Sequence, residues 1–200
     1  MDFLKKWASC IVSFVAGFLG LILSLCTGMK SSYSVVSNTP AVPVNVSNSE
    51  TTKAHKMLTD SKLADQAELY DVKTEFNWLK TFSVIMTVVS ILLIVYAVVM
   101  LLKNLNVIKF EHAIFDIAGI VLAGLLLVAV IGLVITSNVY ANAMEDAVEG
   151  ALKLGYASYI SYLTVSVSVS VGVYQWTMLV VGILAAIAST TFIILKRKNA

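Results

Sequence analysis

The sequence predicts an all-α integral membrane protein in which four transmembrane helices form a bundle with helical extensions on the exterior side. Composition is the first observation behind this prediction. Hydrophobic residues make up 58% of the 200 residues, charged residues make up 13%, and the mean hydropathy is +0.87. Soluble domains contain about 45–50% apolar residues. A chain of this length cannot bury so much apolar surface within itself, so lipid is expected to surround much of it.

The second observation is that charged residues are absent from four long stretches, which are 7–29, 81–102, 117–144 and 154–195. Crossing about 30 Å of hydrocarbon takes about 20 helical residues. Backbone groups in lipid must pair within their own segment, which favours helix. We therefore predict one membrane domain, residues 1–200, with transmembrane helices at about 7–29, 81–102, 113–136 and 176–195.

Two of these stretches allow another interpretation. The first could be a secretory signal that follows Lys5-Lys6, but its apolar core exceeds the usual length of about 7–15 residues. The fourth stretch is long enough for two spans. Two spans would place Lys196-Arg197-Lys198 on the side opposite the N-terminus, which the positive-inside rule disfavours. We therefore keep a retained first helix and four spans.

The third observation is the distribution of Lys and Arg. With both termini inside, the inside segments 1–6, 103–112 and 196–200 hold seven of these residues in 21 positions. The outside loops 30–80 and 137–175 hold seven in 90 positions. Short cytoplasmic segments carry an excess of Lys and Arg. The sequence therefore predicts a protein of the plasma membrane or cell inner membrane with both termini in the cytoplasm.

The first exterior loop, 30–80, divides into two parts. Its beginning is polar and lacks a period, which predicts an extended segment. An amphipathic helix is predicted over about 51–80, because apolar residues recur there at helical spacing, at Leu69, Val72, Phe76 and Leu79. Ser47-x-x-Glu50 fits a capping box at its start. Since no Gly or Pro follows, one helix from about Thr51 to Leu102 is compatible with the sequence.

The second exterior loop, 137–175, also shows two patterns. Residues 141–154 keep helical spacing, which predicts a second helical projection beside the first. Residues 164–173 alternate between Val and Ser, Thr or Gly. Such a period of two favours an extended strand with one apolar face. The alternative is that this segment is the helical entry to the fourth span.

Small residues recur every fourth position in three of the predicted spans. The helix-packing candidates are Ala16, Gly20, Ser24 and Gly28 in the first span, Gly119 and Ala123 in the third, and Gly182 and Ala186 in the fourth. Small residues at this spacing let helix backbones approach closely in lipid. We favour packing within one bundle, and the alternative is oligomerisation or docking of a partner.

Few residues suit an ion or metal site. Asp116 lies near the start of the third span and is a candidate for a proton or cation site. The plainer interpretation, which we favour, is an acid that interacts with the dipole at a helix N-terminus. Glu145, Asp146 and Glu149 are expected to form a solvated helix face rather than a cation site. His55 and His112 fall on opposite sides of the membrane, so no metal site is predicted.

No motif for catalysis or cofactor binding occurs in the sequence. The net charge of +2, without basic patches interleaved with aromatic residues, also argues against nucleic-acid binding. The favoured hypothesis is a non-enzymatic accessory or assembly subunit whose partners are the lipid bilayer and other membrane subunits or further copies of itself. One rival is a small oligomeric channel or transporter component, lined by the hydroxyls of Ser83, Thr87, Ser90, Thr190 and Thr191. A third hypothesis is an immunity or sensor protein.

Overall fold

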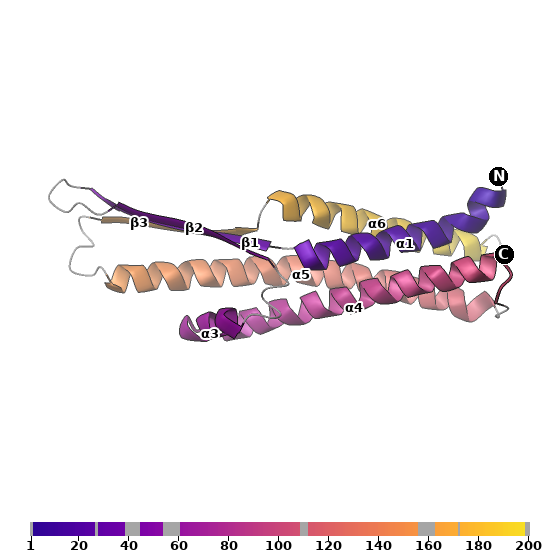
Figure 1. Ribbon diagram of the computed structural model, residues 1–200, viewed down its shortest axis with the longest axis horizontal. Helices are drawn as coiled ribbons and strands as arrows, with labels where there is room; N and C mark the ends of the chain where they lie inside the picture. Colours follow the sequence, from indigo (N-terminus) through magenta and orange to yellow (C-terminus); the bar gives the residue numbers. More distant parts are fainter. Residues whose placement is uncertain are drawn as a thin grey trace. The chain divides into compact units, whose positions relative to one another are not determined.

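The structure is a computed structural model that describes residues 2–26, 28–38, 45–53, 61–108, 112–155, 163–171 and 173–198. The described part is mostly helical and also contains one sheet (Figure 1). Its helices are α1 (Asp2–Cys26), α3 (Ser61–Leu69), α4 (Lys73–Asn104), α5 (His112–Gly155) and α6 (Val173–Lys198). Its strands are β1 (Gly28–Ser37), β2 (Asn45–Lys53) and β3 (Leu163–Val171).

The chain divides into two compact units. The first, called here the helical unit, comprises residues 1–25, 82–134 and 174–200. The second, called the mixed unit, comprises residues 26–81 and 135–173 and contains the sheet. The helices α4 and α5 each contribute residues to both units.

In the helical unit, α1 runs antiparallel to α4 and α6. The Cys10 thiol donates a hydrogen bond to the carbonyl oxygen of Ala97 at 3.0 Å, which joins α1 to α4. The hydroxyls of Ser13 and Ser189 lie 3.4 Å apart and join α1 to α6. At the C-terminal end of α4, the Lys103 ammonium lies 5.6 Å from the centre of the Phe115 ring on α5. These contacts orient all four helices of the unit.

Large apolar side chains of the helical unit are exposed on every one of these helices. Examples are Phe14 and Phe18 on α1, Val88 and Val95 on α4, Val121 and Val128 on α5, and Leu184 and Ile187 on α6. Small residues such as Ala16, Ala123 and Ala186 are buried instead. Among the described residues, α4 and the Ile117–Gly155 part of α5 are long and apolar enough to cross a membrane. The apolar parts described for α1 and α6 are shorter, at Cys10–Leu25 and Leu179–Thr191.

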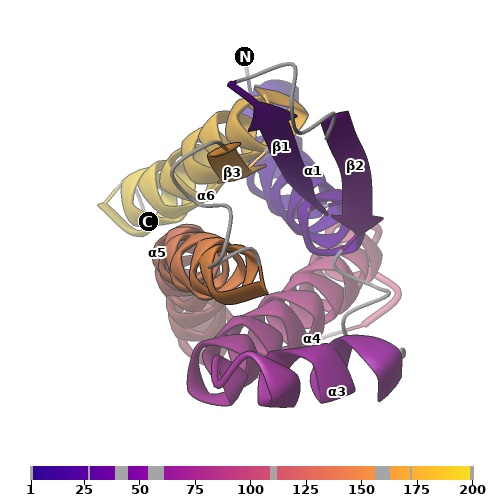
Figure 2. The same cartoon turned by 90° about the vertical axis from the view of Figure 1, so that its left-hand side faces the viewer.

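The mixed unit corrects the prediction of an all-α fold. Its three strands form an antiparallel sheet in the order β2-β1-β3 (Figure 2), in which Tyr33 lies opposite both Asn48 and Val167. The strand predicted over 164–173 is confirmed over residues 164–171, which belong to β3, whereas Val173 begins α6. The polar segment predicted to be an extended loop contains β1 and β2, which find their hydrogen-bond partners in each other and in β3.

The amphipathic helix predicted over 51–80 is correct only in its later part. Residues 45–53 form β2, so the Ser47–Glu50 capping box is wrong, because both residues lie in a strand paired with β1. Residues 54–60 lie outside the described residues. The stripe that defined the prediction is buried at Val72, Phe76 and Leu79, whereas Leu69 is 77% exposed.

The single helix from Thr51 to Leu102 is also wrong, because the chain turns between α3 and α4. Asp71 has a φ of 57°, and its amide donates to the carbonyl of Glu68 at 3.2 Å. The amide of Val72 donates to the carbonyl of Ala67 at 2.9 Å. These two bonds form a Schellman motif, in which a left-handed residue ends a helix. The carbonyl of Val72 then accepts from the amide of Phe76 and starts α4.

The second helical projection predicted over 141–154 is confirmed as the final part of α5. In the mixed unit it packs beside α4, where the rings of Phe76 and Tyr140 lie 5.8 Å apart at an angle of 54°.

Candidate interaction surface

The register of the sheet separates its side chains into two faces, because successive residues of a strand point to opposite sides. On one face, Ser32 of β1 lies between Ser49 of β2 and Ser168 of β3. Two residues further along β1, Ser34 lies between Ser47 and Ser166. Two consecutive rows of three serines therefore cross the sheet. We call these six residues the serine face.

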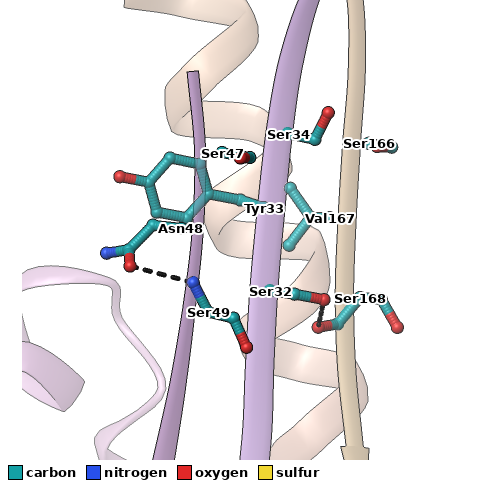
Figure 3. A pocket seen from close by; sticks show the side chains of 9 residues that line it. All are labelled: Ser32, Tyr33, Ser34, Ser47, Asn48, Ser49, Ser166, Val167 and Ser168. Atoms are coloured by element: carbon teal, nitrogen blue, oxygen red, sulfur yellow. Dashed lines mark hydrogen bonds between the residues drawn. The ribbon is translucent and has the colours of Figure 1, made fainter. Parts of the chain in front are cut away.

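The serine face is open to solvent (Figure 3). Ser47, Ser49, Ser166 and Ser168 are exposed, and Ser32 and Ser34 are half-buried. Because serine side chains are short, they leave a shallow depression of about 290 Å³ over the strands, lined by the six serines with Tyr33, Asn48 and Val167. Each serine hydroxyl in the depression can both donate and accept a hydrogen bond.

The opposite face of the sheet lies toward α5. It is apolar along β3 and at Val35 and Val46, but it also carries Ser31 and Asn48. Val35 and Leu163 on this face are buried. A cavity of about 320 Å³ separates the face from the last turns of α5, and it is lined by Tyr33, Val35, Val46, Tyr70, Val148, Ala151 and Leu152. The two faces therefore differ in what covers them: α5 lies over the opposite face, and the serine face has exposed hydroxyls.

On each edge strand, one outward amide donates to a polar side chain. On β3, the Val169 amide donates to the Glu145 carboxylate of α5 at 3.1 Å. This bond shows that Val169 points its backbone away from β1. On β2, the Ser49 amide donates to the side-chain oxygen of the adjacent Asn48 at 2.8 Å (Figure 3). Unpaired edge amides promote pairing with other chains, and these two contacts reduce that tendency.

The predicted helix-packing residues lie at contacts inside the helical unit. A β-carbon on Gly20 would lie 2.5 Å from Ser90 Oγ of α4 and 2.9 Å from Leu126 Cδ1 of α5. A β-carbon on Gly182 of α6 would lie 2.9 Å from Leu23 Cδ1 of α1. At Gly20 the backbone of α1 therefore lies close to side chains of α4 and α5, and at Gly182 the backbone of α6 lies close to a side chain of α1.

The other packing candidates are also buried, with one exception. Ala16, Ser24, Gly119, Ala123 and Ala186 are buried, and the Ser24 hydroxyl donates to the carbonyl of Leu21 at 2.9 Å. Gly28 does not continue this stripe, because α1 ends at Cys26 and Gly28 opens β1 opposite Lys53. Glycine is a poor helix former, so the helix ends before Gly28 and the chain continues as a paired strand.

The acidic candidates do not come together. Asp116 lies near the start of α5, and its side chain is outside the described set. Glu145 binds the Val169 amide, and Glu149 forms an ion pair with Lys153 one turn later. Among the described residues, no group of three His, Cys, Asp or Glu side chains is arranged to hold a metal. His55 lies outside the described residues.

The hydroxyls predicted to line a channel fall into two groups. Thr87, Thr190 and Thr191 donate to carbonyls four residues earlier in their own helices, each at 2.9 Å. Ser83 and Ser90 of α4 are buried, and their hydroxyls have no hydrogen-bond partner in the described part of the chain. Among these five residues, therefore, only the two buried serines have hydroxyls without a hydrogen-bond partner.

Sequence reasoning found one strand of the serine face and missed the other two. The alternation in β3 was visible because four valines mark it. In β1 and β2 the alternating positions are polar on both faces for much of their length, so no period of two stands out. The signal that could have found β1 is its Ser-x-Ser spacing, which matches that of β3.

Comparisons with known proteins give no relative from which a function could be transferred. No protein-family model, curated protein sequence or solved structure shows significant similarity to this chain.

Proposed function

We propose that this chain is a non-enzymatic four-span membrane protein that serves as an accessory or assembly subunit of a membrane complex. In this proposal both termini are cytoplasmic and the mixed unit is exterior. The observation that carries it is the serine face, which is an exposed polar sheet surface in the part of the chain outside the predicted spans. Its partner would be the polar surface of another protein.

The membrane part of the proposal is supported by the side chains of the helical unit. All four of its helices expose large aliphatic or aromatic residues, while five serines are buried, at positions 13, 24, 83, 90 and 189. In water this arrangement would be unfavourable, because exposed apolar patches of this extent drive association. In lipid it is favourable, because small and hydroxyl-bearing residues are the usual contacts between membrane helices.

The subunit part of the proposal is supported by the small side chains and the hydrogen-bonding capacity of the serine face. Serine hydroxyls rotate to suit either a donor or an acceptor. They lose little rotamer entropy when they are buried compared with longer polar side chains. The six serines can therefore form hydrogen bonds with a polar partner surface while they lose little side-chain entropy.

A photo-crosslinking amino acid placed on the serine face tests the subunit proposal. We expect Ser34 and Ser166, each replaced separately by the crosslinker in the full-length protein in cells, to give one discrete adduct. Asp65 on α3 and Asp146 on α5 are exposed control positions in the same unit, and they should give no such adduct. A strictly monomeric protein without adducts at either serine would contradict the proposal.

The channel alternative is supported by the two free hydroxyls on α4. Ser83 and Ser90 are two helical turns apart, so they lie on the same side of α4. Neutral hydroxyls can line a pathway for ions or water. Purified protein in planar bilayers should then show conductance that Ser90→Ala reduces, and electrically silent bilayers would remove this alternative.

A further inference from the structure

The basic residues of the helical unit gather at one of its ends. The contacts Cys10–Ala97 and Ser13–Ser189 place the N-terminal half of α1 beside the C-terminal halves of α4 and α6. The Lys103–Phe115 contact places the start of α5 at the same end. In Figure 1 the two chain ends and the α4–α5 connection lie together at this end of the unit.

Three elements bring basic residues to this end. They are Lys5 and Lys6 in the first turns of α1, Lys103 near the end of α4, and Lys196, Arg197 and Lys198 at the end of α6. We call these six residues the basic end. The other end of the unit, near Leu25, Phe82, Val134 and Tyr174, has no charged residue within the unit's boundaries. The charge is therefore strongly one-sided.

The two units also differ in net charge. The ranges of the helical unit contain seven basic and three acidic residues, which gives +4. The ranges of the mixed unit contain seven basic and nine acidic residues, which gives −2. These values add to the net charge of +2 of the whole chain. The excess positive charge thus belongs to the helical unit.

We propose that the basic end is a binding surface for anionic phospholipid headgroups. It rests on the membrane-spanning part of the proposed function. Clusters of Lys and Arg beside transmembrane helices attract anionic lipids, and the attraction acts within about 10 Å of the surface at moderate salt. The basic end differs from a single basic tail, because residues from the first, second and last helices of the unit act on the same lipids.

The proposal is tested by lipid retention. The full-length protein is reconstituted in vesicles of phosphatidylcholine with one third phosphatidylglycerol, extracted in mild detergent, and its retained lipids are counted by mass spectrometry. We expect phosphatidylglycerol to be enriched over its share in the vesicles. Since each basic residue near an anionic surface changes binding about fivefold, the triple variant Lys196→Gln, Arg197→Gln, Lys198→Gln should lower the enrichment at least tenfold.

A matched variant removes the same amount of charge from the mixed unit. Lys62→Gln, Lys73→Gln and Lys153→Gln together should leave the enrichment unchanged. High salt during extraction should reduce the wild-type enrichment, because salt screens exposed charges. Equal retention of both lipids by the inserted wild-type protein, or an equal loss in both triple variants, would overturn the basic end as a lipid site. Failure of the protein to float with vesicles would overturn the membrane proposal as well.

Discussion

At the scale of single residues, close approach of helices depends on glycines with no space around them. Gly20 lies between Ser90 and Leu126, whereas Gly124 of α5 has no atom within 4 Å of the place where a β-carbon would stand. Both glycines lie in helices of the same unit. They therefore form a natural pair in which the same substitution should have opposite effects.

We expect Gly20→Ala to destabilise the protein by about 1–3 kcal/mol, because the added methyl group must displace packed side chains. Gly124→Ala should be neutral or stabilising by up to about 1 kcal/mol, because alanine is the better helix former. Thermal unfolding in mild detergent measures both changes. If the added substitution Ser90→Gly restores part of the stability lost in Gly20→Ala, the contact is confirmed. Equal melting temperatures for Gly20→Ala and Gly124→Ala would argue against it.

Among the described residues, two other than glycine adopt the left-handed conformation, Asp71 with a φ of 57° and Asn106 with a φ of 59°. Each ends a helix in a Schellman motif. After α4, the amide of Asn106 donates to Lys103 and the amide of Val107 donates to Leu102, both at 3.0 Å. Asparagine and aspartate tolerate this conformation better than most residues, although glycine is preferred.

The turn between α3 and α4 should therefore become more stable when the strain at Asp71 is removed. We expect Asp71→Gly to stabilise the protein by about 0.5–1 kcal/mol, and Asp71→Val to destabilise it by 1 kcal/mol or more, since a β-branched side chain is strained at positive φ. Chemical unfolding measures the difference, followed by tryptophan fluorescence in a Trp7→Phe, Trp176→Phe background that leaves Trp78 as the reporter. A stabilising Asp71→Val variant would contradict the assigned turn.

At the scale of elements, the edge of β3 depends on a carboxylate from α5. We expect Glu145→Ala to leave the Val169 amide open to water, so that this amide exchanges its hydrogen at least about tenfold faster, which corresponds to about 1.4 kcal/mol. Hydrogen exchange resolved to single residues measures the change. Asp146→Ala removes an exposed neighbouring charge and should leave the Val169 amide unaffected. Glu145→Gln, which keeps an acceptor, should give an intermediate rate.

Helices were easier to predict from this sequence than strands for a physical reason. A helix that lies in lipid reveals itself by uninterrupted apolar residues within one segment. A strand at the centre of a sheet depends on partners elsewhere, and β1 pairs with residues 45–53 and with residues 163–171. The helix break at Asp71 was equally hidden, because aspartate rarely replaces glycine at that position.

At the scale of the whole molecule, the predicted membrane topology can be tested by cysteine accessibility. Val107 is exposed at the turn after α4, and Ser31 is exposed in β1. In a Cys10→Ser, Cys26→Ser background, an impermeant thiol reagent applied to intact cells should label Ser31→Cys and leave Val107→Cys unlabelled until the membrane is broken. Val107 is chosen over Asn106, whose positive φ suits few side chains. Labelling of Val107→Cys in intact cells would reverse the predicted orientation.

The sequence predicted some of the residues at the candidate surfaces and missed others. The sequence located the basic segments, because Lys and Arg are visible as residue types. It located most of the small residues that pack the helical unit, because their spacing follows the helical period. It could not reveal the serine face, since that face exists only when three strands from two distant loops align Ser32, Ser49 and Ser168 in one row.

The pairing of β1 with β3 also constrains the order of events during synthesis. Residue 29, just after the first helix, lies opposite residue 171, just before the last helix. The β1–β2 hairpin leaves the ribosome early, and an isolated two-stranded hairpin is only marginally stable in water. Its third strand arrives after α4 and α5 have been made. Completion of the sheet is therefore a late event in biogenesis, and a chain that stops before residue 163 cannot form the serine face.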